Sequence, residues 1–160
     1  MRRGTQISLL LFMLLIVLSC YACSYINSFY VINASDKVIE VRYKVKKPLA
    51  PGLKMPDIPP NILPASKAGE QDAIESLQPS RYKIDPDNWA VVLALNPGEA
   101  LLLAQCRPPE GKTTGDCKEE DFDVEEIDVV GGNGEISLKG VQLHKSFIYQ
   151  SNNRYTLTYR

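Results

Sequence analysis

The sequence has no excess of basic residues. Its 160 residues include 18 Lys and Arg against 19 Asp and Glu, and the single histidine is His144. A protein that binds nucleic acid neutralises phosphates with Lys and Arg side chains. Here acidic residues slightly outnumber basic ones, so we expect no nucleic-acid partner.

Recognisable catalytic and metal-binding motifs are also missing. Gly111-Lys112-Thr113 imitates the end of a phosphate-binding loop, but Cys106 stands where that loop needs its first glycine. No serine is flanked by the glycines of a nucleophile elbow. The acidic stretch 119–128 lacks the glycine of a calcium-binding loop and reads as a solvated face. His144 falls on the polar side of an expected strand, so we expect it to be exposed. The sequence predicts neither a cofactor nor an enzyme.

No apolar run is long enough to span a bilayer. The longest extends from Ile7 to Leu18, interrupted by Ser8, whereas a membrane-spanning helix needs about 20 residues. The run follows the basic head Met1-Arg2-Arg3 and is followed by Ser19 and Cys20. A basic head, an apolar segment and small residues before a cleavage point form a secretory signal. We therefore predict that residues 1–19 are a signal peptide.

The end of this signal, Val17-Leu18-Ser19-Cys20, resembles the lipobox of bacterial lipoproteins. The resemblance implies that Cys20 carries a diacylglyceryl thioether, and that the chain is cut before it and its new amine acylated. Val17 and Ser19 are variants of the commoner Leu and of Gly or Ala. Tyr21 is not the Asp that retains such proteins in the inner membrane, which implies the outer membrane, facing the periplasm. An ordinary signal peptide that ends near a cysteine is the alternative.

The rest of the chain suits one domain, with a lipidated tether at 20–27 and an antiparallel β-sandwich at 28–160. The clearest strand is 38–46, where Ile39 and Val41 alternate with Glu40 and Arg42. Short strands with turn residues between them indicate an immunoglobulin-like or transthyretin-like sandwich. We expect about eight strands, at 27–33, 38–46, 89–95, 100–106, 122–130, 136–138, 141–149 and 155–159. The strands at 89–95 and 100–106 are expected to form a central hairpin.

A Pro-rich excursion interrupts the strands at 48–88. Six prolines lie within 48–64, and because proline cannot donate to a ladder we expect no strand there. Residues 66–77 are expected to form a short helix. The apolar residues within 48–64 have no regular spacing and are candidates for contact with a partner, and the segment 48–64 is expected to be dispensable for folding but not for partner binding. These candidates are Leu53, Met55, Ile58 and Ile62.

Two of the four cysteines flank a short loop. Cys106 and Cys117 enclose ten residues without a large apolar side chain, and an exported chain meets an oxidising compartment. We predict a disulfide between them; a metal site is the alternative, although no His or CxxC spacing supports it. Cys23 lies three residues after Cys20, but lipidation of Cys20 would remove one thiol of that pair and leave Cys23 unpaired.

These features lead to one functional hypothesis and two alternatives. The first is a lipid-anchored, non-catalytic binding or scaffold component of the bacterial cell envelope, with the membrane and an envelope protein as its partners. The second is an inhibitor or ligand-binding lipoprotein that uses the Cys106–Cys117 loop. The third, an envelope hydrolase, is disfavoured because no acid, base and nucleophile can be named together.

We predict from the lipobox resemblance that purified mature protein carries a lipid on Cys20. We expect two or three acyl chains, because a single acyl chain binds a bilayer only marginally. Intact mass spectrometry should show the mass of the chain from residue 20 plus its acyl groups. Cys20→Ala should give an uncut or misplaced product, and an unmodified mature wild type would refute the assignment.

Overall fold

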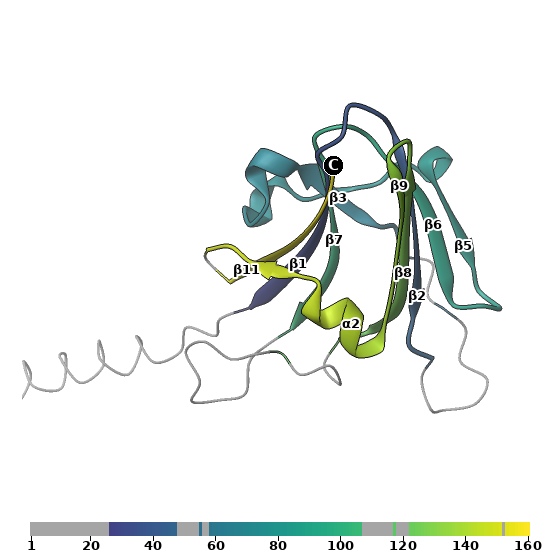
Figure 1. Cartoon of the computed structure of the whole chain (residues 1–160). Coiled ribbons are helices and arrows are strands. Elements are labelled where there is room, and N and C mark those ends of the chain that lie inside the picture. Colours follow the sequence, from purple (N-terminus) through teal and green to yellow (C-terminus); the bar gives the residue numbers. More distant parts are fainter. Residues whose placement is uncertain (1–25, 48–54, 56–57, 107–116, 118–121, 152) are drawn as a thin grey trace, which may run out of the picture.

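Two β-sheets packed face to face form the domain (Figure 1). The computed structural model describes residues 26–47, 55, 58–106, 117, 122–151 and 153–160. The expected all-β, sandwich-like architecture is confirmed. The strands are β1 Asn27–Asn33, β2 Ile39–Val45, β3 Asn61–Pro64, β4 Glu75–Ser76, β5 Tyr82–Asp85, β6 Ala90–Leu95, β7 Glu99–Cys106, β8 Val124–Gly131, β9 Gly134–Lys139, β10 Ile148–Tyr149 and β11 Arg154–Tyr159.

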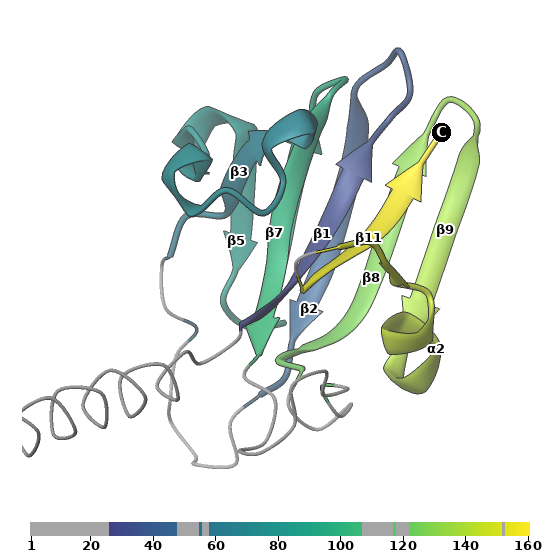
Figure 2. The same cartoon turned by 90° about the vertical axis from the view of Figure 1, so that its left-hand side faces the viewer.

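The six-stranded sheet has the order β10-β11-β1-β7-β3-β4, and the five-stranded sheet has the order β5-β6-β2-β8-β9. Neighbours pair antiparallel, with one exception. β1 pairs parallel with β11, so the first and last of these strands lie side by side (Figure 2). The expectation of a wholly antiparallel sandwich is therefore corrected to antiparallel-rich.

Strict alternation of side chains builds the core between the sheets. In β2, Ile39 and Val41 are buried while Glu40 and Arg42 are exposed, as the sequence predicts. Facing strands add apolar residues at the same spacing, because successive side chains of a strand point to opposite faces. The largest residues of this core include Phe29, Val31, Leu93, Leu95, Leu101, Phe122, Ile127 and Leu143.

The predicted hairpin of β6 with β7 is wrong, since the two strands belong to different sheets. The turn between them docks on the six-stranded sheet: Gly98 donates its N–H to the carbonyl of Asn33, and Ala65 donates to the carbonyl of Gly98. Arg81 secures the crossing by donating to the Glu99 carboxylate and to the Ala94 carbonyl, the latter at 3.0 Å. Both strands are apolar on both faces, so the sequence pattern does not select their partners.

The Pro-rich excursion joins the fold where we expected no strand. β3 follows Pro60 directly and ends at Pro64, and its residues 61–64 pair with β7. Residues 61–63 keep their N–H groups, so the prolines limit the strand without preventing it.

The helix expected at 66–77 is also wrong. Two 3-10 turns, Ala65–Lys67 and Gln71–Ala73, and the short β4 take its place. Gly69, at φ 101°, lies between the turns in a backbone conformation that interrupts a helix. The segment covers the outer face of the six-stranded sheet, where Tyr30, Leu63 and Ala100 form a second buried cluster.

The expected strand at 141–149 is replaced by helix α2, Gly140–Lys145, followed by the two-residue β10. Gly140 has a φ of 51°, which lets the chain leave β9 and turn at once into the helix. α2 packs on β8 and β9 through the fully buried Leu143 and lies between the edges of the two sheets (Figures 1 and 2). A spacing of two between Val141 and Leu143 suggested a strand, but only Leu143 is buried.

We predict that Gly131→Ala destabilises the domain by about 1–3 kcal/mol through overpacking. A Cβ at Gly131 would lie 2.7 Å from the Tyr159 hydroxyl and 2.8 Å from Ile39 Cγ2, and both residues are buried. The Tyr159 hydroxyl is also held by bonds to Asn133 and Gly134. Gly132→Ala is the control, since its Cβ would meet the flexible Lys37 at 3.4 Å. Equal urea midpoints for the two variants would contradict this prediction.

Candidate functional site

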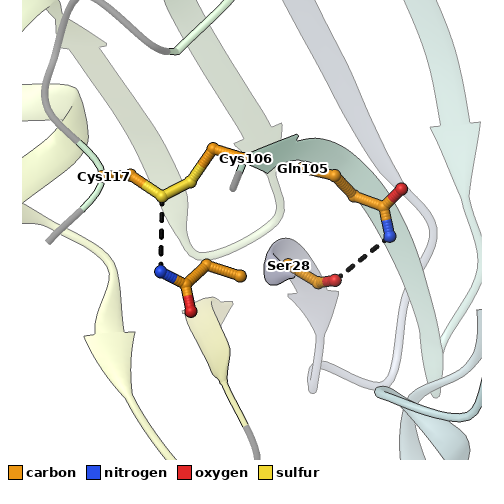
Figure 3. Close-up of a disulfide and its surroundings, with 5 residues drawn as sticks. Ser28, Gln105, Cys106 and Cys117 are labelled. Atoms are coloured by element: carbon orange, nitrogen blue, oxygen red, sulfur yellow. Dashed lines mark hydrogen bonds between the residues drawn. A yellow bond between two sulfur atoms is a disulfide. The ribbon is translucent and has the colours of Figure 1, made fainter. Parts of the chain in front are cut away.

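The predicted cysteine pair lies at one end of the sandwich. Cys106 ends β7, and its Cα is 6.3 Å from that of Cys117, with the sulfurs at disulfide distance (Figure 3). That Cα separation is ordinary for a disulfide. Asn27, itself buried, donates its side-chain N–H to Cys117 Sγ at 3.3 Å. Beside it the amide of Gln105 donates to the hydroxyl of Ser28 at 3.2 Å.

An aromatic cluster lies next to the cysteine pair in the core. Phe29 stacks on Tyr155 at 4.8 Å and meets Phe122 and Phe147 edge-on, with ring centroids 4.9 and 5.4 Å away. Contacts of this geometry stabilise beyond the area they bury. The cluster joins β1, β11, the residues just after α2 and the residues just before β8, so it ties the cysteine end of both sheets together.

The surroundings of His144 differ from those that the sequence predicts. We expected an exposed residue on a strand, but α2 turns its ring toward Phe29 and Phe122, with centroids 5.9 and 6.1 Å away. Its Nε2 is buried and has no hydrogen-bond partner among the described residues. The side chain as a whole is half-buried and packs against aromatic rings.

An open hollow of about 690 Å³ lies on the outer face of the five-stranded sheet. Val92 and Ala94 of β6 line it. Lys83 of β5, Arg81 just before β5 and Glu40 of β2 complete the lining on this side. The β8–β9 hairpin closes its other side. This site was not predicted from the sequence, because its residues come from separate strands. The available signal was that Val92 and Ala94, on a strand apolar on both sides, share one face.

Opposite charges pair across the strands on the rest of this outer face. Glu126 of β8 accepts hydrogen bonds from Lys44 of β2 at 2.8 Å and from Lys139 of β9 at 2.6 Å. The bonds from Lys139 and Lys44 hold the pKa of Glu126 below its ordinary value. In the next row Arg42 lies opposite Asp128, which accepts a hydrogen bond from Ser137. These parts of the basic and acidic stretches therefore pair within one sheet.

The residues predicted to contact a partner are placed differently from one another. Leu53 and Cys20 lie outside the described residues. Met55 and Ile62 are partly buried and pack against the main core, and Ile58 is 65% exposed. Of the four apolar candidates, Ile58 is thus the described one whose side chain is open to a partner.

No family model matches the chain, and comparison with curated proteins and with solved structures gives no match. Function therefore has to be argued from the geometry. Within the described ranges, no three His, Cys, Asp or Glu side chains are grouped to hold a metal ion. No helix in the same ranges is long and apolar enough to cross a membrane.

We predict that Cys106→Ala with Cys117→Ala folds but melts lower, with a loss of about 3 kcal/mol at most. Closing an 11-residue separation mainly restricts the unfolded chain, and the surrounding strands stay intact. Alanine is chosen because both positions are buried. Peptide mapping without reductant should join residue 106 to 117, and a link from Cys23 to either one would contradict the assignment.

We predict that Glu126→Gln destabilises the protein at pH 7 and that the difference from wild type fades below about pH 4. The folded-state pKa of Glu126 is lowered, so its stabilisation is present above the ordinary carboxyl pKa and is lost as the pH falls through the lowered value. Urea unfolding at several pH values measures the difference. Glu125→Gln, at an exposed neighbouring position, is the control, and a constant difference down to pH 2 would contradict the prediction.

Proposed function

We propose that this protein is a lipid-anchored, non-catalytic binding component of the bacterial cell envelope that acts through protein–protein contact. The observation that carries the proposal is the open hollow on the five-stranded sheet. Elsewhere on that face charged side chains pair with one another, whereas at the hollow Val38 and Val130 are 54% and 42% exposed. Exposed apolar groups rimmed by polar ones are typical of a contact surface.

The chemistry of the hollow fits a segment of another protein. Small apolar side chains, Val92 and Ala94, offer contact area, while Lys83 and Glu40 supply opposite charges at the rim. Charges of both signs around an apolar centre favour orientation and specificity over bulk affinity. A small ligand is usually held in an enclosed cavity that buries most of its surface. An open hollow suits a protruding loop or strand better.

The lipobox resemblance supports the anchor. If Cys20 is lipidated, the seven peptide units between the Cα atoms of Cys20 and Asn27 span at most about 25 Å, which keeps the domain near the bilayer. β1, which receives this tether, belongs to the six-stranded sheet, and the hollow lies on the far face of the other sheet. The proposal therefore turns the hollow away from the membrane, toward the periplasm if the anchor is in the outer membrane. We also propose that the sandwich is of immunoglobulin-like or transthyretin-like type.

A second candidate function is an inhibitor or ligand-binding lipoprotein that uses the loop between Cys106 and Cys117. The observation that favours it is the firm base of that loop. Both cysteines are buried, and the amide of Asn27 holds Cys117. A loop fixed at both ends loses less conformational entropy on binding.

Site-specific photo-crosslinking in intact envelopes tests the proposal and separates it from its alternative. A photoreactive residue at Val130 should give a discrete adduct with one envelope protein, and the same residue at Asp72, exposed above the other sheet, should give none. Probes at Lys112 and Ile58 test the loop and the Pro-rich segment. An adduct from Lys112 with none from Val130 would favour the inhibitor, and no adduct from any position would count against contact with a protein.

A further inference from the structure

The strand β9 forms an edge of the five-stranded sheet. Among the described residues β9 pairs only with β8. The other edge strands are shorter: β4 and β10 have two residues each, and β5 has four and is followed by Pro86. β9 has six residues and no proline. Natural proteins usually blunt an edge with short strands, proline, charged side chains or inward-pointing charges, because an open edge pairs with another strand. β9 is neither short nor interrupted by proline, and its charged residues, Glu135 and Lys139, are of opposite sign.

The backbone hydrogen bonds of β2 fix which backbone groups of β9 point away from the sheet. Val45 donates its N–H to Trp89, on the β6 side of β2, and Lys46 donates to Asp123, on the β8 side. Since these groups alternate between the two neighbours of a strand, Glu40, Arg42 and Lys44 face β8.

The same alternation continues across β8. Val130, Asp128 and Glu126 face β2, so Ile127, Val129 and Gly131 face β9. In β9, Gly134, Ile136 and Leu138 therefore bond to β8. The backbone N–H and C=O groups of Glu135 and Ser137 point off the edge, together with the N–H of Lys139, and they form a row of donors and acceptors for a further strand. The Lys139 carbonyl is not part of this row, because Lys139 is the N-cap of α2 and its C=O accepts the first hydrogen bond of the helix.

We propose that β9 pairs antiparallel with β9 of a second copy of this chain, centred on Ser137. This register sets Glu135 opposite Lys139 of the second copy, and Ser137 opposite Ser137. All three residues then face the outward-pointing residues of the other copy, which completes four backbone hydrogen bonds: two between the Ser137 residues and one from each Lys139 N–H to the Glu135 carbonyl of the other copy. The two five-stranded sheets become one continuous sheet of ten strands.

Charge complementarity argues for a second copy over an unrelated strand. On the outer face, Lys44, Glu126 and Lys139 already alternate in sign along one row. Glu135 of the second copy extends this row with the next negative charge, and by symmetry the same happens on the other side. Opposite charges directly across a strand pair are favourable, and like charges are unfavourable.

The inner face is complementary in the same register. Ile136 and Leu138 are half-buried and pack against the core from the open edge. In the dimer Ile136 lies across from Leu138 of the second copy, so the apolar inner layer continues through the interface. The two-fold axis is perpendicular to the sheet, so both six-stranded sheets lie on one side and both hollows on the other. If Cys20 anchors the chain, both tethers reach one membrane.

Charge reversal tests the proposal on the purified full chain in detergent. Sedimentation equilibrium should show a wild-type dimer. Glu135→Lys places Lys opposite Lys139 twice, and Lys139→Glu places Glu opposite Glu135 twice, so each should weaken dimerisation about tenfold or more. An equal mixture of the two variants should restore it, because both cross-strand pairs are then of opposite sign. Glu40→Lys, on the same face but at the hollow, should leave dimerisation unchanged.

A cysteine crosslink keeps the test decisive if a charge variant folds poorly. Ser137→Cys in a Cys23→Ser background should give a disulfide-linked dimer under mild oxidation. Lys83→Cys, on the opposite edge strand, should stay monomeric. A monomeric wild type, or a dimer unaffected by both charge reversals, would overturn the proposal. So would a monomer whose Glu135→Lys variant loses an envelope partner, since that result assigns the edge to another protein. Self-association is measured without any envelope partner, so its outcome is independent of the hollow's function.

Discussion

The pleat of the strands is the constraint on which this structure depends. Burying Ile127 and Val129 between the sheets forces Glu126, Asp128 and Val130 onto the outer face of the same strand. The pairing of β8 with β2 and β9 then places Glu126 between two lysines. The core, the charged face, the hollow and the free edge of β9 are therefore consequences of one register. A slip of one residue in the pairing of β8 would move its buried side chains to the outer face and its charged side chains into the core.

Where a strand has one apolar and one polar face, the sequence alone predicted it well. β2 was predicted to within one residue at each end, because its alternation is unambiguous. β1, which is buried on both faces, was predicted to the residue because turn residues follow it directly at 33–36. Strands apolar on both faces, such as β6 and β7, were located but not paired, since nothing in their pattern names a neighbour. Short elements were predicted wrongly for another reason. The change from β9 to α2 depends on the positive φ of Gly140, which the spacing of apolar residues does not reveal.

The candidate sites divide in the same way. The Cys106–Cys117 pairing could be predicted because it depends on local spacing, together with the oxidising compartment that the predicted signal peptide implies. The hollow could not, because it requires knowing that β6 lies between β2 and β5. The surroundings of His144 were predicted wrongly because its segment was expected to be a strand and is the helix α2. Ile62 seemed available to a partner because prolines surround it, yet β3 pairs with β7 and turns this side chain toward the core.

The central claim is that the outer face of the five-stranded sheet is the working surface, with the hollow as the part a partner covers. Labelling a single cysteine tests this most directly. Val92→Cys, at the hollow, and Asp72→Cys, above the other sheet, would each be made in a Cys23→Ser background and treated with a bulky, charged maleimide. We expect Val92→Cys to react in the purified protein and to be protected in native envelopes, while Asp72→Cys reacts in both. Equal labelling of Val92→Cys in both preparations would contradict the claim.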